Sequence, residues 1–174
     1  TTGRVSIITA NGTAISENDF TVAATSFPSV QQGDKLVGTG VIGMAEQGSS
    51  VSISADGNTA IVGGINDNNI GAAWIFTRTV DAWTQQGGKL VGTDSTMYST
   101  QGFSVSLSAD GNTAIVGGLQ DNNNIGAAWI YIRTGNVWVQ QGEKLTGTGA
   151  IEEAGFGASV SLSADGNTAI IGGP

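Results

Sequence analysis

Short stretches in which apolar and polar residues alternate run through the chain and recur at a fixed distance. In residues 50–54 the apolar Val51 and Ile53 alternate with serines, and this period of two predicts a β-strand. Asp56 and Gly57 follow, and Asp-Gly between two such stretches predicts a hairpin turn, because Gly accepts a positive φ. No segment combines a 3.6-residue period with capping residues, so we expect an all-β fold almost without helix.

The alternation predicts four short strands in each repeating unit. In the first complete unit they cover residues 50–54, 59–62, 72–78 and 83–91. Trp74 and Phe76 share one face of the third strand, and Trp129 is the counterpart of Trp74 in the next unit. Mid-strand aromatic residues at repeat-equivalent positions favour packing over binding, so we expect Trp74 and Trp129 in the core.

Three strings carry the repeat. The string QQGDKLVG at residues 31–38 returns in closely similar form at 85–92 and 140–147, which are steps of 54 and then 55 residues. SADGNTAIVGG recurs with the same steps, and IGAAWIFTR occurs a second time as IGAAWIYIR. The extra residue falls in a polar, Asn-rich loop, which is where a duplicated structural unit tolerates insertion.

A unit of this length with four antiparallel strands is typical of one blade of a β-propeller. We predict a partial propeller of about two and a half blades in residues 25–174. A lone fourth strand at about residues 30–37 precedes two complete units, and half a unit ends the chain. Because such an arrangement leaves apolar faces open, we expect the chain to be a fragment of a full ring or to complete the ring with another copy of itself.

Residues 1–24 carry no copy of the repeat. Residues 5–8 and 14–22 predict two strands joined across Asn11 and Gly12, and residues 23–28 would be a linker. The phrase GRVSIITANGTAISENDFTV resembles the closing hairpin of immunoglobulin-like IPT/TIG domains. That resemblance implies the C-terminal hairpin of an Ig-like module, and the alternative is a hairpin of no particular family.

The repeat itself resembles the FG-GAP repeat of bacterial surface proteins, which is related to the blades of the integrin α-subunit propeller. Phe156 and Gly157 precede the first strand of the last unit, and residues 172–174 (Gly-Gly-Pro) stand where the family has Gly-Ala-Pro. The family's SV-x-LS-x-DGNT segment matches residues 159–168, and W-x-QQ-x-KL matches 83–90 and 138–145. The resemblance covers residues 27–174 and implies a propeller with a secreted or cell-surface location, a role in adhesion or recognition, and no catalysis.

Composition narrows the function further. Six Lys and Arg stand against 14 Asp and Glu, and the net charge of -8 argues against nucleic acid and anionic membranes as partners. The absence of Cys and His excludes disulfides, a Cys nucleophile and a Ser-His-Asp triad within this chain. The expected partners are a protein or glycan at the cell surface, the remaining blades of the same protein, or another copy of the chain.

The Asp-Gly turns raise the question of calcium. Integrin-type blades hold this ion in a loop with several carboxylates, whereas the turn at Asp56 offers one, and Ca²⁺ takes about 6–8 oxygen ligands. We therefore expect Asp56 and its counterparts Asp110 and Asp165 to bond the turn backbone. The alternative of a weakly bound calcium ion is not favoured, and no cofactor is expected.

Two groups of residues are candidates for ligand binding. The Asn-rich loops offer oxygen atoms to a weak cation or a sugar, although Asn and Asp are also ordinary turn residues. The tryptophans that begin the fourth strands are expected to be half exposed and could stack on a sugar ring. The candidates are Asp67, Asn68, Asn69, Asp121, Asn122, Asn123, Trp83 and Trp138.

The function predicted from these observations is a non-catalytic extracellular scaffold or adhesion module of a larger bacterial protein. The alternatives are a carbohydrate-binding propeller, or part of a propeller enzyme whose active residues lie in other blades. Lys35, Lys89 and Lys144 fall on the predicted fourth strand, where we expect a charge to discourage pairing between sheet edges.

Overall fold

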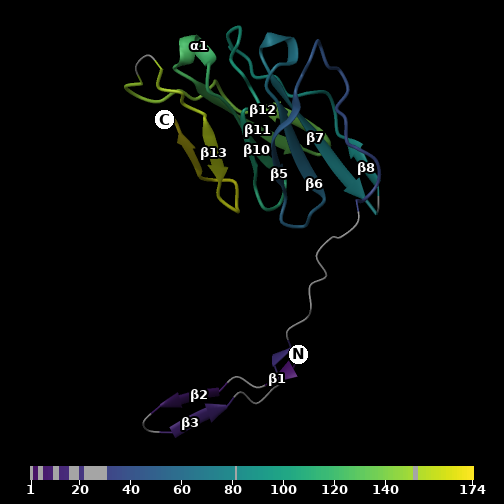
Figure 1. Ribbon diagram of the computed structural model, residues 1–174, viewed down its shortest axis with the longest axis vertical. Coiled ribbons are helices and arrows are strands. Elements are labelled where there is room, and N and C mark those ends of the chain that lie inside the picture. Colours follow the sequence, from purple (N-terminus) through teal and green to yellow (C-terminus); the bar gives the residue numbers. More distant parts are fainter. Residues whose placement is uncertain are drawn as a thin grey trace. The chain divides into compact units, whose positions relative to one another are not determined.

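The computed structural model describes residues 31–80, 82–150 and 153–174, and the backbone of four short strands within residues 1–30 (Figure 1). Those strands are β1 (Thr2–Gly3), β2 (Ser6–Thr9), β3 (Gly12–Ile15) and β4 (Phe20–Thr21). β2 pairs with β3 and β1 with β4, both antiparallel. This part belongs to a compact unit, Thr1–Gln32, distinct from Gly33–Pro174. The predicted turn residue Asn11 and the predicted linker lie outside the described residues.

The second unit consists of three antiparallel sheets, as the repeats predict. The first sheet contains β5 (Gln47–Ile53), β6 (Thr59–Gly64), β7 (Ala72–Thr79) and β8 (Ala82–Gln85) in that order. The second sheet contains β9 (Ser104–Leu107), β10 (Thr113–Gly118), β11 (Ala127–Thr134) and β12 (Val137–Gln140). The third sheet pairs β13 (Ser159–Leu162) with β14 (Ala169–Gly172).

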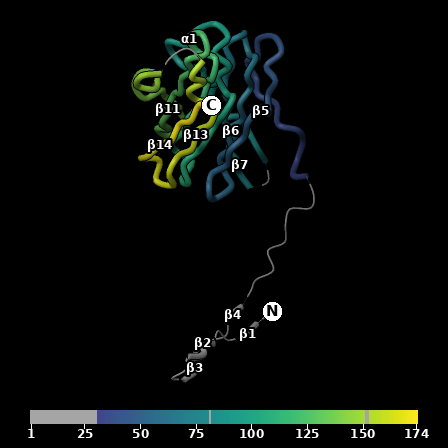
Figure 2. Tube along the Cα trace, turned by 60° about the vertical axis from the view of Figure 1, so that its left-hand side comes forward, coloured from purple at the N-terminus to yellow at the C-terminus, as the bar shows by residue number. Residues whose placement is uncertain are grey.

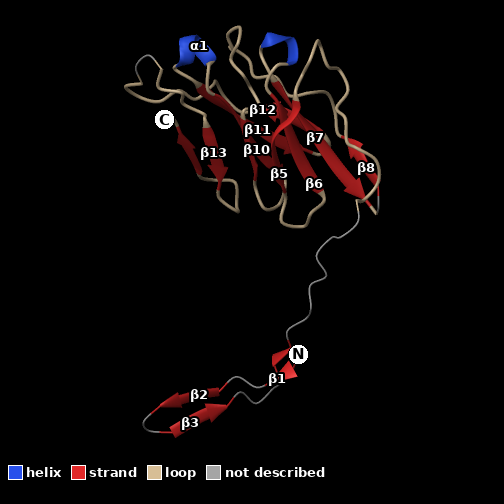
Figure 3. Ribbon diagram, viewed as in Figure 1, coloured by secondary structure: helices blue, strands red, loops and turns tan. Residues whose placement is uncertain are grey.

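The described residues contain almost no helix, and the prediction of an all-β fold is confirmed. The two short helices are η1 (Asp67–Asn69) and α1 (Asp121–Asn124), each placed before the third strand of its sheet (Figure 3). Among the described residues, no helix is long and apolar enough to cross a membrane.

The predicted fourth strands are wrong in length. β8 ends at Gln85 instead of continuing to residue 91, and after it only Leu90 returns to pair with Ala73. The physical reason is the pair Gly87 and Gly88, of which Gly87 takes a left-handed φ of +73° that breaks the extended backbone.

The predicted lone strand at about residues 30–37 is also not found. Val30 lies outside the described residues, and residues 31–37 form no strand. The equivalent segment of the first sheet is held by backbone hydrogen bonds between Leu90 and Ala73 of its own third strand. No third strand that could hold residues 31–37 in this way is found among the described residues before them.

Successive sheets lie side by side through their first strands, since β5 contacts β9 and β9 contacts β13. Figure 2 shows the third sheet (β13 and β14, yellow) on one side of this unit and β5 (blue) on the other. The Leu107 amide donates to Ser52 Oγ at 3.1 Å, and one repeat later the Leu162 amide donates to Ser106 Oγ at 3.1 Å. The hairpin turns are joined as well, because the Ala109 carbonyl accepts from the Ala55 amide at 2.9 Å. The sequence repeat is therefore also a repeat of contacts between sheets.

Glycine is required where the sheets approach each other. A Cβ on Gly63 would lie 2.1 Å from the Gly102 carbonyl oxygen, and one on Gly117 would lie 2.2 Å from the Gly157 oxygen. These distances are far below van der Waals contact, so no larger residue fits without moving backbone.

The core has two parts: a main cluster between the first and second sheets, which includes Trp129, and a smaller cluster of Ala45, Ala72, Trp74 and Phe76 on the other face of the first sheet. Trp129 and Trp74 are fully buried, and each indole N–H donates to a backbone carbonyl at 2.9 Å, that of Thr93 and of Thr39 respectively. Burying such a ring contributes about 2–3 kcal/mol. The predicted packing role of these two tryptophans is confirmed. The main cluster comprises Ile61, Ala73, Ile75, Leu90, Val105, Leu107, Ala114, Val116, Ala127, Trp129 and Tyr131.

We predict that Gly117→Ala lowers the free energy of unfolding by about 2 kcal/mol, because the added methyl group is forced against the Gly157 carbonyl. Gly88→Ala is the matched control, since a Cβ there meets no atom within 4 Å. Urea unfolding measures both. Equal stability of the two variants would show that the second and third sheets do not approach as described.

Candidate functional site

The structure places the predicted ligand residues at the two opposite ends of the strands, which we call the two edges of the second unit. The Asn-rich loops precede β7 and β11, whereas Trp83 pairs with Arg78 near the far end of β7 and Trp138 pairs with Arg133 of β11. The length of β7 separates the two edges by about 20 Å. The tryptophans and the asparagines therefore do not form one site.

The two aspartates of the Asn-rich loops are internal. Asp67 is 1% exposed, accepts from the Ile42 amide at 2.7 Å, and forms an ion pair with Lys89. In the next unit Asp121 is fully buried and forms the same pair with Lys144. These carboxylates tie the loop to the segment that precedes the first strand and to the segment that follows the fourth.

The predicted edge-protecting role of the lysines is corrected by these pairs. Lys89 and Lys144 are held against buried carboxylates, and neither lies within a strand. Each lysine follows its aspartate by 22 or 23 residues, so the sequence alone does not indicate that they pair. The packed loop brings the two side chains together. Lys35, the counterpart in residues 31–38, is exposed.

The asparagines of the same loops are exposed. Asn68, Asn122 and Asn123 adopt left-handed φ values of 52°, 50° and 57°, a conformation that Asn tolerates better than most residues. Their backbone is fixed by neighbours, since the Asn68 amide donates to the Ile42 carbonyl and the Asn122 amide to Thr96 Oγ1. The amide side chains are thus displayed on a backbone that is held in place.

Sequence reasoning missed a tyrosine at this edge. The Tyr98 amide donates to the Asn69 carbonyl at 2.6 Å, while its side chain is 63% exposed and its φ is +64°. The available signal was that residues 93–100 (TDSTMYST) differ from the equivalent 39–46 (TGVIGMAE), although the strings around them repeat. We call six exposed residues of this edge the asparagine edge: Asn68, Asn69, Met97, Tyr98, Asn122 and Asn123.

The opposite edge is built on the Asp-Gly turns. Asp56 Oδ1 accepts from Ser54 Oγ at 2.6 Å and from the Asn58 amide at 2.9 Å, as the turn chemistry predicts. These hydrogen bonds hold the pKa of Asp56 below its usual value. Asp110 and Asp165 repeat the arrangement, and in both the first cause of the lowered pKa is again the serine two residues earlier.

The same turns position the half-buried tryptophans. Asn112 Oδ1 accepts from Arg133 Nε at 2.9 Å, and the Arg133 guanidinium lies 5.6 Å from the centre of the Trp138 ring. The first sheet repeats this, with Arg78 at 5.6 Å from the Trp83 ring. One face of each ring is therefore covered by a cation, which leaves less of the ring for stacking on a sugar.

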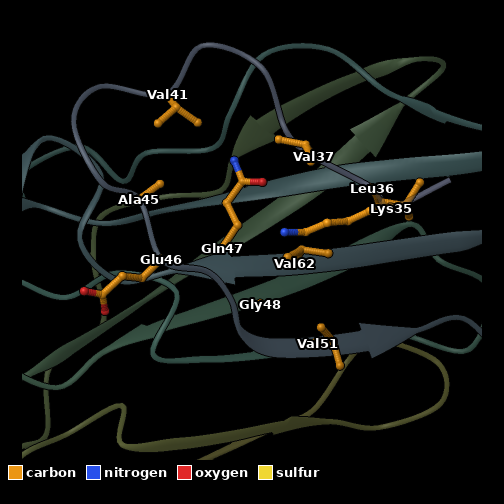
Figure 4. A pocket seen from close by; sticks show the side chains of 10 residues that line it. All are labelled: Lys35, Leu36, Val37, Val41, Ala45, Glu46, Gln47, Gly48, Val51 and Val62. Atoms are coloured by element: carbon orange, nitrogen blue, oxygen red, sulfur yellow. The ribbon is translucent and has the colours of Figure 1, made fainter.

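A groove runs along the outer face of the first sheet. It encloses about 560 Å³ and is lined by apolar side chains that include Val37, Val51 and Val62 (Figure 4). Gln47 points from β5 toward the facing segment, where its side-chain oxygen accepts from the Gly38 amide at 2.7 Å. The groove contains mostly apolar surface and no assembled set of reactive groups.

Tyr131 carries a hydroxyl for which no partner is found among the described residues. Burial raises the pKa of this phenol. Phe76 stands at the equivalent position of the first sheet and packs without a hydroxyl. The aromatic ring is thus the part that both units share.

Among the described residues, no group of three or more Asp or Glu side chains is placed to hold a metal ion. Comparison of the sequence with protein-family models and with curated proteins gives no match.

We predict that Lys144→Met lowers the free energy of unfolding by about 3 kcal/mol, because it leaves the buried Asp121 carboxylate without its counter-charge. Lys35→Met, at the exposed counterpart, should change stability by less than about 0.5 kcal/mol. Thermal and urea unfolding of both variants provide the measurement. If Lys144→Met leaves the free energy of unfolding unchanged, the ion pair does not anchor the loop.

We predict that stability falls as the pH drops below about 4. The Asp110 pKa is lower in the folded chain than in the unfolded chain, so its contribution is complete above the unfolded value of about 3.9. The contribution is lost as the pH falls through the folded value. Asp110→Asn should flatten this dependence, measured as the urea midpoint between neutral and acidic pH. An unchanged slope would contradict the assignment.

Proposed function

We propose that this chain is part of a β-propeller that serves as a non-catalytic extracellular recognition scaffold, with the FG-GAP-like repeats as its blades. The observation that carries the proposal is that successive sheets pack through their first strands with the same hydrogen bonds each time, Ser52 to Leu107 and Ser106 to Leu162. Radial packing of four-stranded sheets through inner strands is what a propeller requires.

The asparagine edge is the proposed recognition surface. It presents amide groups that both donate and accept hydrogen bonds, together with the exposed aromatic ring of Tyr98. Asn and Tyr are residues that adaptable binding surfaces favour, because they combine polar contacts with a rigid amphipathic ring. The residues of these loops differ between units, whereas the framework that holds them repeats. This combination is typical of a scaffold whose loops recognise partners.

Five repeat-related carboxylates among the described residues support a structural use over a catalytic one. Asp67 and Asp121 neutralise lysines inside the fold, and Asp56, Asp110 and Asp165 cap hairpin turns. A general acid or base must reach a substrate proton, whereas these groups are already engaged by neighbouring side chains and amides. A cell-surface location is part of the same proposal and follows from the repeat resemblance.

The test is binding of the chain to an array of glycans and to an array of purified extracellular-matrix proteins. We expect binding on one of the arrays, weakened about tenfold or more by Tyr98→Ala. Thr134→Ala, an exposed residue at the opposite edge, should bind like the unmodified chain.

Three results would overturn the proposal. The first is no binding on either array, and the second is binding that Tyr98→Ala leaves unchanged. The third is glycan binding that is lost only in Trp138→Ala, which would assign recognition to the opposite edge, where Trp83 and Trp138 lie. Far-ultraviolet circular dichroism of each variant confirms that the compared proteins are folded.

A further inference from the structure

Equivalent residues on the first strands differ sharply in exposure. Val105 and Leu107 of β9 are 9% and 7% exposed, because they pack against the first sheet. Their counterparts on β5, Val51 and Ile53, are 70% and 57% exposed. The first sheet therefore leaves exposed, along β5, part of the apolar face that the second sheet buries, while Trp74 and Phe76 on the same face are covered.

The opposite face is exposed on the third sheet. Ile61 and Ile115 are fully buried, each on the face of its sheet that receives the next sheet. Their counterpart on β14, Ile170, is 73% exposed. We call Gly48, Val51, Ile53 and Val62 the head face, and Ser159, Ser161, Ile170 and Gly172 the tail face.

We propose that a second copy of this chain docks head to tail, with its tail face on the head face of the first. The occupant follows from the chain itself, which contains this contact twice, between the first and second sheets and between the second and third. An apolar face that buries its repeat-equivalent inside the chain is complementary to the same face of another copy. The inference depends on the packing of the sheets and not on the proposed recognition role.

The polar groups of the two faces are in matching register. Ser50 Oγ donates to the Gly102 carbonyl at 2.7 Å and Ser104 Oγ to the Gly157 carbonyl at 2.8 Å. By the same repeat, Ser159 Oγ of one copy meets the Gly48 carbonyl of the other. Ser161 is the counterpart of Ser52 and Ser106, which accept the leucine amides, so it meets the Ile53 amide in the same way.

A glycine on the head face supports this docking. Gly102 and Gly157 have φ values of 86° and 93° and lie against glycines of the preceding sheet, where a Cβ would clash. Gly48 has the same left-handed backbone, with φ of 98°, yet a Cβ on it would meet nothing within 4 Å. Its conformation is the one that these contacts use, already formed on an uncovered surface.

The contact is heterologous, since two different faces meet, and one copy can bind a partner at each end. Because the third sheet has two strands, it covers only the part of the head face nearest β5. A contact of this limited size is weak, so we expect association to depend on concentration. The edge of β14 stays open in this arrangement and adds no hydrogen bonds to it.

Sedimentation velocity over a concentration series tests the proposal. The unmodified chain should increase in mass beyond one copy as concentration rises. Val51→Asp on the head face and Ile170→Asp on the tail face should each remain monomeric, because either substitution places a charge in the contact. Val137→Asp, an exposed position on the outermost strand β12, is the matched control and should associate normally.

Mixing the two monomeric variants gives the sharpest result. Val51→Asp keeps an intact tail and Ile170→Asp an intact head, so the mixture should form dimers and nothing larger. Recovery of the dimer also shows that both variants are folded. A chain that is monomeric at every concentration, association unaffected by both substitutions, or a mixture that stays monomeric would overturn the proposal. If the chain is monomeric at every concentration, the partners of the head and tail faces are further repeat units and not a second copy.

Discussion

The close approach of neighbouring first strands is the constraint on which the rest of this structure depends. Between sheets, serine hydroxyls bond to backbone groups of the neighbouring sheet, as where Ser52 Oγ accepts from the Leu107 amide. Glycines at the same places lack the Cβ atoms that would keep the strands apart. Because the spacing is set by these glycines and short serine side chains and not by longer, adaptable side chains, each sheet fixes the position of the next. The apolar core between the sheets and the stacking of the hairpin turns both follow from that spacing.

The same constraint explains why the two edges differ in character. Where the first strands turn, each Asp-Gly hairpin is closed by a Ser-Asp-Asn network. In the first two sheets the Asn of this network also accepts from the arginine that covers the outer tryptophan, so this edge repeats with little change. At the other edge, buried ion pairs such as Asp121–Lys144 hold the loops from inside, and the exposed residues are free to differ between units. A surface of this kind changes its contacts with a partner without disturbing the framework, which is the physical basis of the proposed recognition role.

Local patterns predicted the elements well, and contacts between distant segments could not be predicted. The alternation around Val51 and Ile53, the Asp-Gly turns and the buried Trp74 and Trp129 are confirmed, because period and turn chemistry act within a few residues. The fourth strand was predicted too long, since its string resembles a strand while Gly87 ends it. The Asp–Lys pairs and the exposed ring of Tyr98 depend on which segments meet in the fold, and neither spacing nor residue type specifies that. The asparagines were correctly expected in loops, but their separation from Trp83 and Trp138 required the strand order.

The most direct test of the account is the scalar coupling that NMR detects through a hydrogen bond, measured between the Ala55 amide nitrogen and the Ala109 carbonyl carbon. These atoms belong to hairpin turns of different sheets, and the nitrogen lies 2.9 Å from the carbonyl oxygen in the structure. The account predicts a coupling here and a second one between the Ala109 amide and the Ala164 carbonyl, together with slow exchange of both amide protons. Couplings confined to pairs within each sheet, with fast exchange at Ala55 and Ala109, would contradict the side-by-side packing of the repeated sheets.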